Sequence, residues 1–277
     1  MPISIPEALQ DAGQVAAGKA AASRSVPRYL FSSALAGAYV GIAVVLLVSV
    51  SAPMYLAESP MTKLVQGSVF GIALTLVVFA GADLFTGTNM TMLQGLRQRT
   101  VTFADVGKVW GLSLLGNLLG ALGFAGLVHA GGTMTHAPGE KLVASMVQAK
   151  GLATGPQLFA RAVLCNALVC LAMWMAARAQ GDAAKLIVLW WALLAFVASG
   201  FEHSIANMTT FGLAMFQGHA TFGDLMANLV WTVPGNIVGG GLIIGLGYSW
   251  LGSPARRVEV PRGPSGSSSP VPLEAPK

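Results

Sequence analysis

One histidine lies inside a long apolar stretch of the chain, where its side chain is the one best suited to chemistry. His203 stands in the segment Gly-Phe-Glu-His-Ser-Ile-Ala-Asn, residues 200–207. An unsatisfied polar group within a membrane costs several kcal/mol, so an ionisable side chain there usually serves a function. The imidazole can donate a hydrogen bond to an anion or relay a proton. The alternative is a structural histidine that bonds a backbone carbonyl.

Four further polar residues lie in or beside apolar stretches. Asp83 and Glu202 occupy matching positions in the two halves of the chain. Each can relay protons or bind a cation, but we expect each to cap backbone N–H groups that a helix break leaves free. Thr86 has a hydroxyl that can bond His203, a solute or the local backbone. Lys150 is either an ordinary solvated lysine or a positive charge at the mouth of a pathway.

No set of residues in the sequence matches a catalytic or metal-binding pattern. Ser204 adjoins His203, but neighbours on a helix point about 100° apart and do not face each other. The chain has no His-Glu-x-x-His, no Gly-x-Ser-x-Gly and no phosphate-binding loop that ends in Lys-Ser or Lys-Thr. Cys165 and Cys170 lie in one apolar segment, where we expect buried packing residues. The sequence therefore predicts neither an enzyme nor a metal or cofactor site.

The composition indicates a membrane protein. Hydrophobic residues make up 54% of the 277 residues and charged residues only 10%, whereas a soluble domain carries about 25% charged residues. The net charge of +5 comes from short basic clusters at the ends of apolar runs. That placement fits orientation in a membrane and not a nucleic-acid surface. Membrane lipid is therefore an expected partner and nucleic acid is not.

Six apolar runs are long enough to cross a bilayer, which takes about 20 residues each. They are 30–52, 64–96, 106–129, 157–177, 185–217 and 225–251. The second and fifth runs exceed one crossing and hold polar residues near their middles, at Asp83–Thr88 and Ser199–Asn207. We expect each of these runs to form two half-helices with a break. Irregular backbone at that depth is tolerated only where protein buries it or water lines it, so the breaks indicate a pore or a site.

The two halves of the chain repeat each other. Gly81-Ala-Asp and Asn89-Met90 in the first half match Gly200-Phe-Glu and Asn207-Met208 in the second. Each half continues to a Gly-Asn pair at the same spacing, with asparagines Asn117 and Asn236. Each half holds three predicted spans, and an odd number forces the second copy to enter the membrane inverted. The sequence thus predicts an all-α membrane protein of six helices in an inverted 3+3 repeat, with helices 2 and 5 broken.

Three segments are predicted along the chain. Residues 1–28 form an amphipathic helix on the membrane face, 29–252 the channel domain, and 253–277 a disordered tail. Basic residues concentrate at the N-terminus, in the loops 97–108 and 178–185, and in the tail. The positive-inside rule then places both termini in the cytoplasm of a bacterium, with the domain in its inner membrane.

Residues 25–252 resemble the formate/nitrite transporter family. The segments that carry the resemblance are Phe70-Gly-Ile-Ala-Leu, Gly81-Ala-Asp-Leu-Phe-Thr, Cys165-Asn-Ala-Leu-Val-Cys and Phe196-Val-Ala-Ser-Gly-Phe-Glu-His-Ser-Ile-Ala-Asn-Met. The resemblance implies an aquaporin-like protomer fold and a homopentamer in which every protomer has its own pore. It is strongest to the nitrite branch and implies passage of nitrite or a similar small anion, with possible coupling to protons. Formate or hydrosulfide is the alternative solute.

The resemblance also assigns roles to single residues. It implies that His203 is the central histidine, hydrogen-bonded to Thr86 with Asn166 nearby, and that Lys150 stands in a vestibule. For the constrictions it implies an outer pair and an inner slit, made of Phe70 and Phe196, and of Leu74, Leu84, Phe85, Val169 and Ala206. Asn117 and Asn236 are implied to face the pore or to pack. Asp83, Glu202 and Asn207 belong to the helix breaks.

Overall fold

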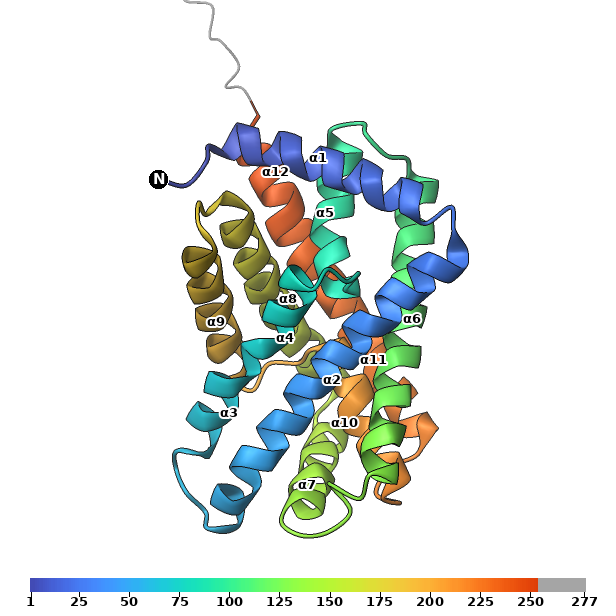
Figure 1. The fold of residues 1–277 in the computed structure, drawn as a ribbon, viewed down its shortest axis with the longest axis vertical. Helices are drawn as coiled ribbons and strands as arrows, with labels where there is room; N and C mark the ends of the chain where they lie inside the picture. Colours follow the sequence, from blue (N-terminus) through green and yellow to red (C-terminus); the bar gives the residue numbers. More distant parts are fainter. Residues whose placement is uncertain (254–277) are drawn as a thin grey trace, which may run out of the picture.

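The computed structural model describes residues 1–253, and over that range the chain is helical with no strand (Figure 1). The helices are α1 (Ile5–Ala22), α2 (Val26–Leu56), α3 (Thr62–Phe70), α4 (Ile72–Phe79), α5 (Phe85–Arg97), α6 (Phe103–Ala130), α7 (Gly139–Leu152), α8 (Gly155–Arg178), α9 (Asp182–Ala198), α10 (Ser204–Phe216), α11 (Phe222–Asn236), the π-helix η1 (Ile237–Leu246) and α12 (Gly247–Leu251). The predicted tail lies outside the described residues apart from Ser253.

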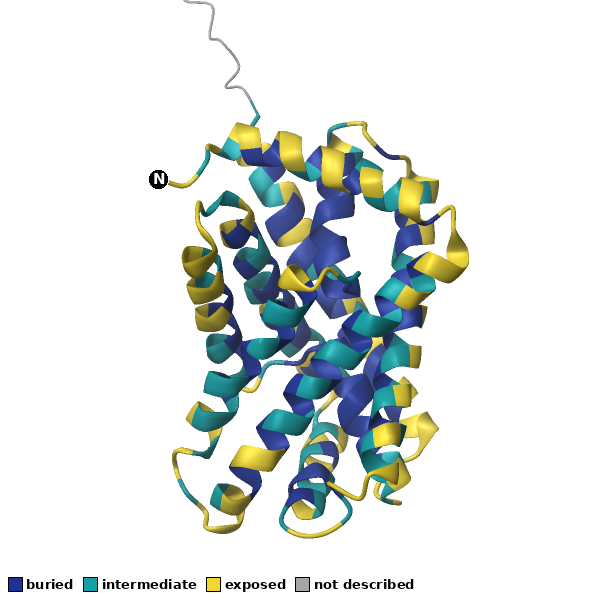
Figure 2. Cartoon of the chain, viewed as in Figure 1, coloured by how far each residue is buried: buried dark blue, intermediate teal, exposed yellow. Residues whose placement is uncertain are grey.

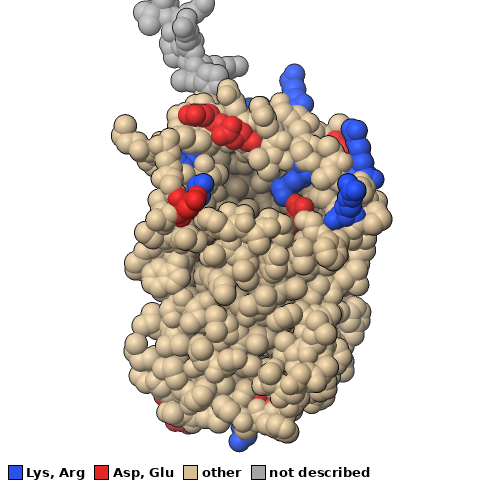
Figure 3. All heavy atoms as spheres, viewed as in Figure 1, with Lys and Arg blue, Asp and Glu red and all other residues tan. Residues whose placement is uncertain are grey.

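The long helices form one elongated bundle with a short helix at each end. In Figure 1, α1 lies across one end of the bundle and α7 lies at the other. Charged side chains gather at these two ends, and the face seen in Figure 3 has a wide belt between them without Lys, Arg, Asp or Glu. A belt of this kind suits the hydrocarbon core of a bilayer, which is about 30 Å thick.

Five helical segments are long and apolar enough to cross a membrane. They are Val26–Leu56, Thr62–Phe79, Phe103–Ala130, Gly155–Arg178 and Phe222–Leu251. The remaining predicted span, 185–217, is divided between α9 and α10, which have 17 and 13 residues. Neither helix is long enough to cross a membrane by itself, because a break separates the two. The all-helical membrane class is confirmed.

Both predicted helix breaks exist. The chain leaves the helix over residues 80–84 and 199–203, and each break contains a glycine with positive φ, 78° at Gly81 and 74° at Gly200. Glycine adopts this conformation without the steric cost that a Cβ imposes. Thr88 and Asn207, the last residues of the two polar stretches, lie in the first turns of α5 and α10.

Glycines bring the third helix of each half against the first. A Cβ at Gly120 of α6 would lie 1.8 Å from the carbonyl oxygen of Ala34 in α2. A Cβ at Gly239 of η1 would lie 2.1 Å from the carbonyl oxygen of Val163 in α8. Only glycine allows backbones to approach this closely. The two contacts hold the scaffold that positions the breaks.

The two end helices differ from the predicted outline. The helix α1 is shorter than the predicted segment 1–28, and Ala8, Leu9, Gly13 and Ala16 lie on its buried face (Figure 2). It is fixed to α5 by a hydrogen bond from the side chain of Gln98 to the carbonyl of Leu9. The helix α7 was not predicted, because the segment 131–149 reads as a loop between spans. The structure places Lys150 in the last turn of this helix.

Candidate transport pathway

The central feature of the pathway is a contact between the two broken helices. His203 is the N-cap of α10, and its Nδ1 accepts a hydrogen bond from the backbone N–H of Ala206 at 3.1 Å. A neutral imidazole that accepts at Nδ1 carries its proton on Nε2. That Nε2 lies 3.1 Å from Oγ1 of Thr86, in the first turn of α5, so the imidazole donates to the hydroxyl. The predicted contact between His203 and Thr86 is therefore present. The imidazole donates to this hydroxyl and not to a backbone carbonyl, which was the alternative.

Asn166, the third predicted pathway residue, contacts the backbone of Thr86. The amide of Asn166 in α8 donates to the carbonyl of Thr86 at 3.2 Å and to the carbonyl of Asn236 at 2.7 Å. The thiol of Cys170, one turn further along α8, also donates to the carbonyl of Thr86 at 3.3 Å. His203, Thr86 and Asn166 are all buried. They therefore form one connected group between the two halves of the chain.

An open cavity of about 420 Å³ leads from the α7 end of the bundle to this group. Phe70 and Phe196 meet edge to face in its wall with ring centroids 5.7 Å apart, and Phe196 stacks on the ring of His203 at 5.9 Å. Among the predicted pathway and break residues, the cavity is lined by Phe70, Lys150, Phe196, Glu202, His203, Ala206 and Asn207. The structure thus brings the residues of the predicted outer constriction together.

The remaining predicted constriction residues do not line this cavity. Leu74, Leu84, Phe85 and Val169 are buried and belong to the same hydrophobic core cluster. Leu84 ends the first break and Phe85 begins α5.

The expectation that the two carboxylates cap the helix breaks was wrong, because each carboxylate pairs with a lysine. Glu202 accepts from Nζ of Lys150 at 2.7 Å and from the amide of Asn207 at 2.8 Å. Asp83 accepts from Nζ of Lys19, in α1, and from the hydroxyl of Ser32 at 3.0 Å. A partly buried carboxylate needs a counter-charge, and a lysine from an end helix supplies it in both cases.

Two asparagines cap the broken helices instead. Oδ1 of Asn117 accepts from the N–H of Phe85 at 2.8 Å, and Oδ1 of Asn236 accepts from the N–H of Ser204 at 2.9 Å. Both amide groups donate to the carbonyl of the carboxylate residue in the break and to one carbonyl of the first long helix of their half. These donor contacts are Asn117 to Asp83 and Ser33, and Asn236 to Glu202 and Ala162. A neutral amide satisfies both kinds of backbone group without burying charge.

Two functional candidates were missed in the sequence. Lys19 lies in the basic N-terminal segment and precedes the first span much as Lys150 precedes the fourth. Arg161, in the second turn of α8, lines the same cavity as His203. Lys63 lines it as well, so the cavity wall has three basic residues, Lys63, Lys150 and Arg161, against the single carboxylate of Glu202.

A helical membrane protein whose two broken helices meet at a buried histidine, below a cationic open cavity, is built for the passage of a solute. Comparison with known proteins agrees: the family described as formate/nitrite transporter matches residues 8–250. The chain belongs to this family, whose characterised relatives are transporters and channels and not enzymes.

Individual relatives cover most of the chain. The nitrite transporter NirC of Escherichia coli (strain K12) is 43% identical over 226 residues, which are 80% of this chain and 82% of that protein. The formate channel BtFdhC of Bacillus thuringiensis is 30% identical over 84% of this chain and 90% of its own length. Among solved structures, an FNT family ion channel superposes with a TM-score of 0.84 at 39% identity, covering 90% of this chain and 99% of its own. A pentameric formate channel with formate bound gives 0.71 at 28% identity, covering 83% of this chain and 98% of its own.

Proposed function

We propose that this chain assembles as a homopentamer in a bacterial inner membrane and that each protomer conducts nitrite through its own helix bundle. The observation that carries the proposal is the contact between His203 and Thr86. It joins the two broken helices next to the paired rings of Phe70 and Phe196, at the inner end of a cationic cavity. The similarity to a nitrite transporter at 43% identity supports nitrite as the solute.

The charges of the cavity favour an anion. Three basic side chains line it against one carboxylate, and that carboxylate is neutralised by Lys150. The net positive charge raises the local concentration of anions, because a low-dielectric cavity focuses the field of its charges. A cation or ammonium pathway would require more carboxylates than basic side chains in the cavity wall.

Beyond the cavity, the anion must lose water at the phenylalanine pair. Transfer of a bare anion into an apolar neck is unfavourable unless donors replace its hydration shell. Thr86 accepts the proton of His203 Nε2, so its own hydroxyl proton is free for the solute. His203 and Thr86 together supply a polar step between Phe70 and Phe196 on one side and Leu74, Leu84, Phe85 and Val169 on the other. A proton passed along with nitrite would lower the barrier further by neutralising its charge.

The architecture that we propose has six crossings in an inverted 3+3 repeat, as in an aquaporin-like protomer. In support, the asparagine caps, the glycine contacts and the lysine–carboxylate pairs occur once in each half of the chain. The channel domain would comprise 29–252, with 1–28 on the membrane surface and a cytoplasmic tail from 253. Basic residues cluster at the α1 end, which favours a cytoplasmic position for both termini. Reporter fusions after Gly252 and after Gly132 should give opposite topology signals.

The flux experiment uses purified protein in liposomes, with nitrite, formate, chloride and hydrosulfide compared at equal gradients. We expect nitrite to pass fastest and to emerge chemically unchanged. Formate or hydrosulfide passing faster than nitrite would favour the alternative solutes of this family, to which the formate channels among its relatives point. Absence of flux for all four anions would refute the proposal.

A further inference from the structure

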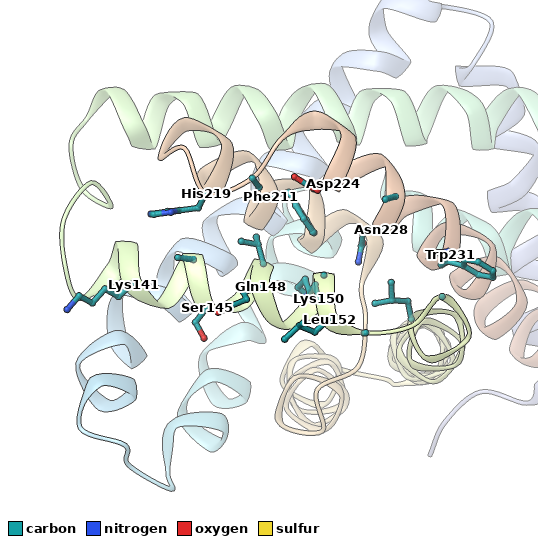
Figure 4. Close-up of a pocket in the computed structure, with 18 of the residues that line it drawn as sticks. Lys141, Ser145, Gln148, Lys150, Leu152, Phe211, His219, Asp224, Asn228 and Trp231 are labelled. Atoms are coloured by element: carbon teal, nitrogen blue, oxygen red, sulfur yellow. The ribbon is translucent and has the colours of Figure 1, made fainter.

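A second open cavity lies at the α7 end of the bundle and is not used by the pathway. It has a volume of about 940 Å³ and lies between α7, the turn from α10 to α11, and the first turns of α8 (Figure 4). His203 and the phenylalanine pair do not line it. Lys150 lines both cavities, and no other residue among 1–253 does. The two cavities are therefore separated by the wall to which Lys150 belongs.

That wall contains a chain of hydrogen bonds whose direction is fixed. Glu202 is paired with Lys150, so its carboxylate can only accept, and Asn207 must turn its NH₂ group toward it. The same NH₂ group lies 2.8 Å from Asn228, which must therefore present its oxygen. The hydroxyl of Thr232 donates to that oxygen as well, at 3.3 Å.

It follows that the NH₂ group of Asn228 faces the other way, toward the second cavity. In Figure 4 its nitrogen points from α11 toward α7. Asn228 is 3% exposed and lines the cavity, and its Nδ2 has no hydrogen-bond partner among the described residues. A buried donor without an acceptor costs free energy, so an acceptor from outside the chain is favoured at this point.

The charged groups around the cavity favour an anionic acceptor. Lys141 and Lys150 line it, and its one carboxylate, Asp224, is already bonded to the backbone and hydroxyl of Thr221. His219 lines it too, and its ring contacts Glu140 at 2.8 Å. Two lysines against one carboxylate give the lining a net charge of +1 (2 − 1), and Lys150 is paired with Glu202 outside it.

We propose that this cavity is a second binding site for a small anion, held by the amide of Asn228 and the positive charge of Lys150. The site goes beyond the proposed function, because it lies off the pathway and its occupancy is measured without any flux. Because Lys150 lines both cavities, an anion bound there adds to the pool of anions beside the pathway.

Iodide is a suitable probe, because it quenches indole fluorescence and scatters X-rays anomalously. Trp231 lines the cavity and is 41% exposed. Its contribution is the difference in emission between the wild-type pentamer and Trp231→Phe. We expect static, saturable quenching of this component, and an iodide peak within hydrogen-bonding distance of Asn228 in crystals of the full chain. Non-saturable quenching, or a lipid headgroup or water in place of iodide, would overturn the proposal.

The decisive variant is Asn228→Asp, which keeps an oxygen for Asn207 and Thr232 but replaces the free donor with a negative charge. We expect iodide affinity at Trp231 to fall about tenfold or more, as for the loss of one hydrogen bond to a charged group. Thr133→Asp adds the same charge on the exposed loop after α6, outside the cavity, and should leave the affinity unchanged. If Asn228→Asp fails to assemble, Gln148→Glu on the exposed rim must weaken iodide binding in the same direction. Wild-type affinity in an assembled Asn228→Asp or Gln148→Glu variant contradicts the site.

Discussion

The two helix breaks share a scaffold and differ in the N-cap residue of the helix that follows each of them. Both contain a glycine with positive φ, a carboxylate paired with a lysine, and a first helical N–H bonded to an asparagine. At the N-cap, however, the first break has Leu84 and the second has His203. The supporting contacts thus occur in both breaks, whereas the imidazole occurs in the second break alone. The repeated contacts account for the similar shape of the two breaks, and the residue at the second N-cap position gives the pathway its polar centre.

The largest expected effect tests whether the two scaffolds are equivalent. Asn117→Leu and Asn236→Leu each leave one backbone N–H and two carbonyls without their partners, at a cost of about 1–3 kcal/mol for each group. We expect both variants to lose most of the thermal stability of the pentamer, by similar amounts, measured as the midpoint of dissociation in detergent. A large loss for one and none for the other would show that only one break depends on its asparagine.

The two lysine–carboxylate pairs should contribute unequally to the thermal stability of the pentamer. The side chains of Lys150 and Glu202 are 14% and 5% exposed, against 22% and 17% for Lys19 and Asp83. Removing one partner of a buried ion pair costs about 3–5 kcal/mol, whereas exposed pairs contribute about 0–1 kcal/mol. Lys150→Met should therefore lower the dissociation midpoint more than Lys19→Met does. The reverse order would mean that α1 stabilises its end of the bundle more than α7 does.

Replacing the N-cap residue of the second break should change flux and leave assembly intact. His203→Leu gives the second break the N-cap of the first and removes the donor to Thr86. We expect nitrite flux in liposomes to fall about 10- to 100-fold, the range for a lost hydrogen bond to a charged group. His203→Asn retains a neutral donor and should keep more of the flux. An assembled His203→Leu pentamer with wild-type flux would exclude His203 from the pathway.

The smallest effect concerns the rim of the pathway cavity. Lys63 is exposed there and acts on a passing anion only through a screened field, whose range is about 8–10 Å near physiological salt. Lys63→Glu should lower nitrite flux a few-fold in dilute buffer and hardly at all in 1 M salt. A loss that persists at high salt would indicate a direct contact or a structural role.

The sequence predicted the positions of the breaks because glycine and polar residues interrupt apolar runs in a way that needs no tertiary information. It also predicted the contact between Thr86 and His203, through the family resemblance. It failed on the caps, since Asn117 and Asn236 reach the breaks from a different helix, and hydrophobic periodicity does not show which side chain will satisfy a distant N–H. The helix α7 was missed because its segment is short and polar. The pairing of Lys150 with Glu202 was missed as well, because Lys150 lies on that helix. The pairing of Lys19 with Asp83 was also missed, because the two residues lie 64 positions apart in the sequence.

The position of the asparagines in the chain has a consequence for biosynthesis. The N–H of Phe85 has no hydrogen-bond partner until Asn117 is synthesised, 32 residues later. The N–H of Ser204 likewise has none until Asn236 is synthesised, also 32 residues later. Until then each break enters the membrane with unpaired backbone groups, which hydrocarbon does not tolerate. Each half of the chain is therefore the smallest unit that can leave the insertion machinery with its polar backbone satisfied. Nascent chains that end between Phe85 and Asn117 should stay with that machinery longer than those that end after α6.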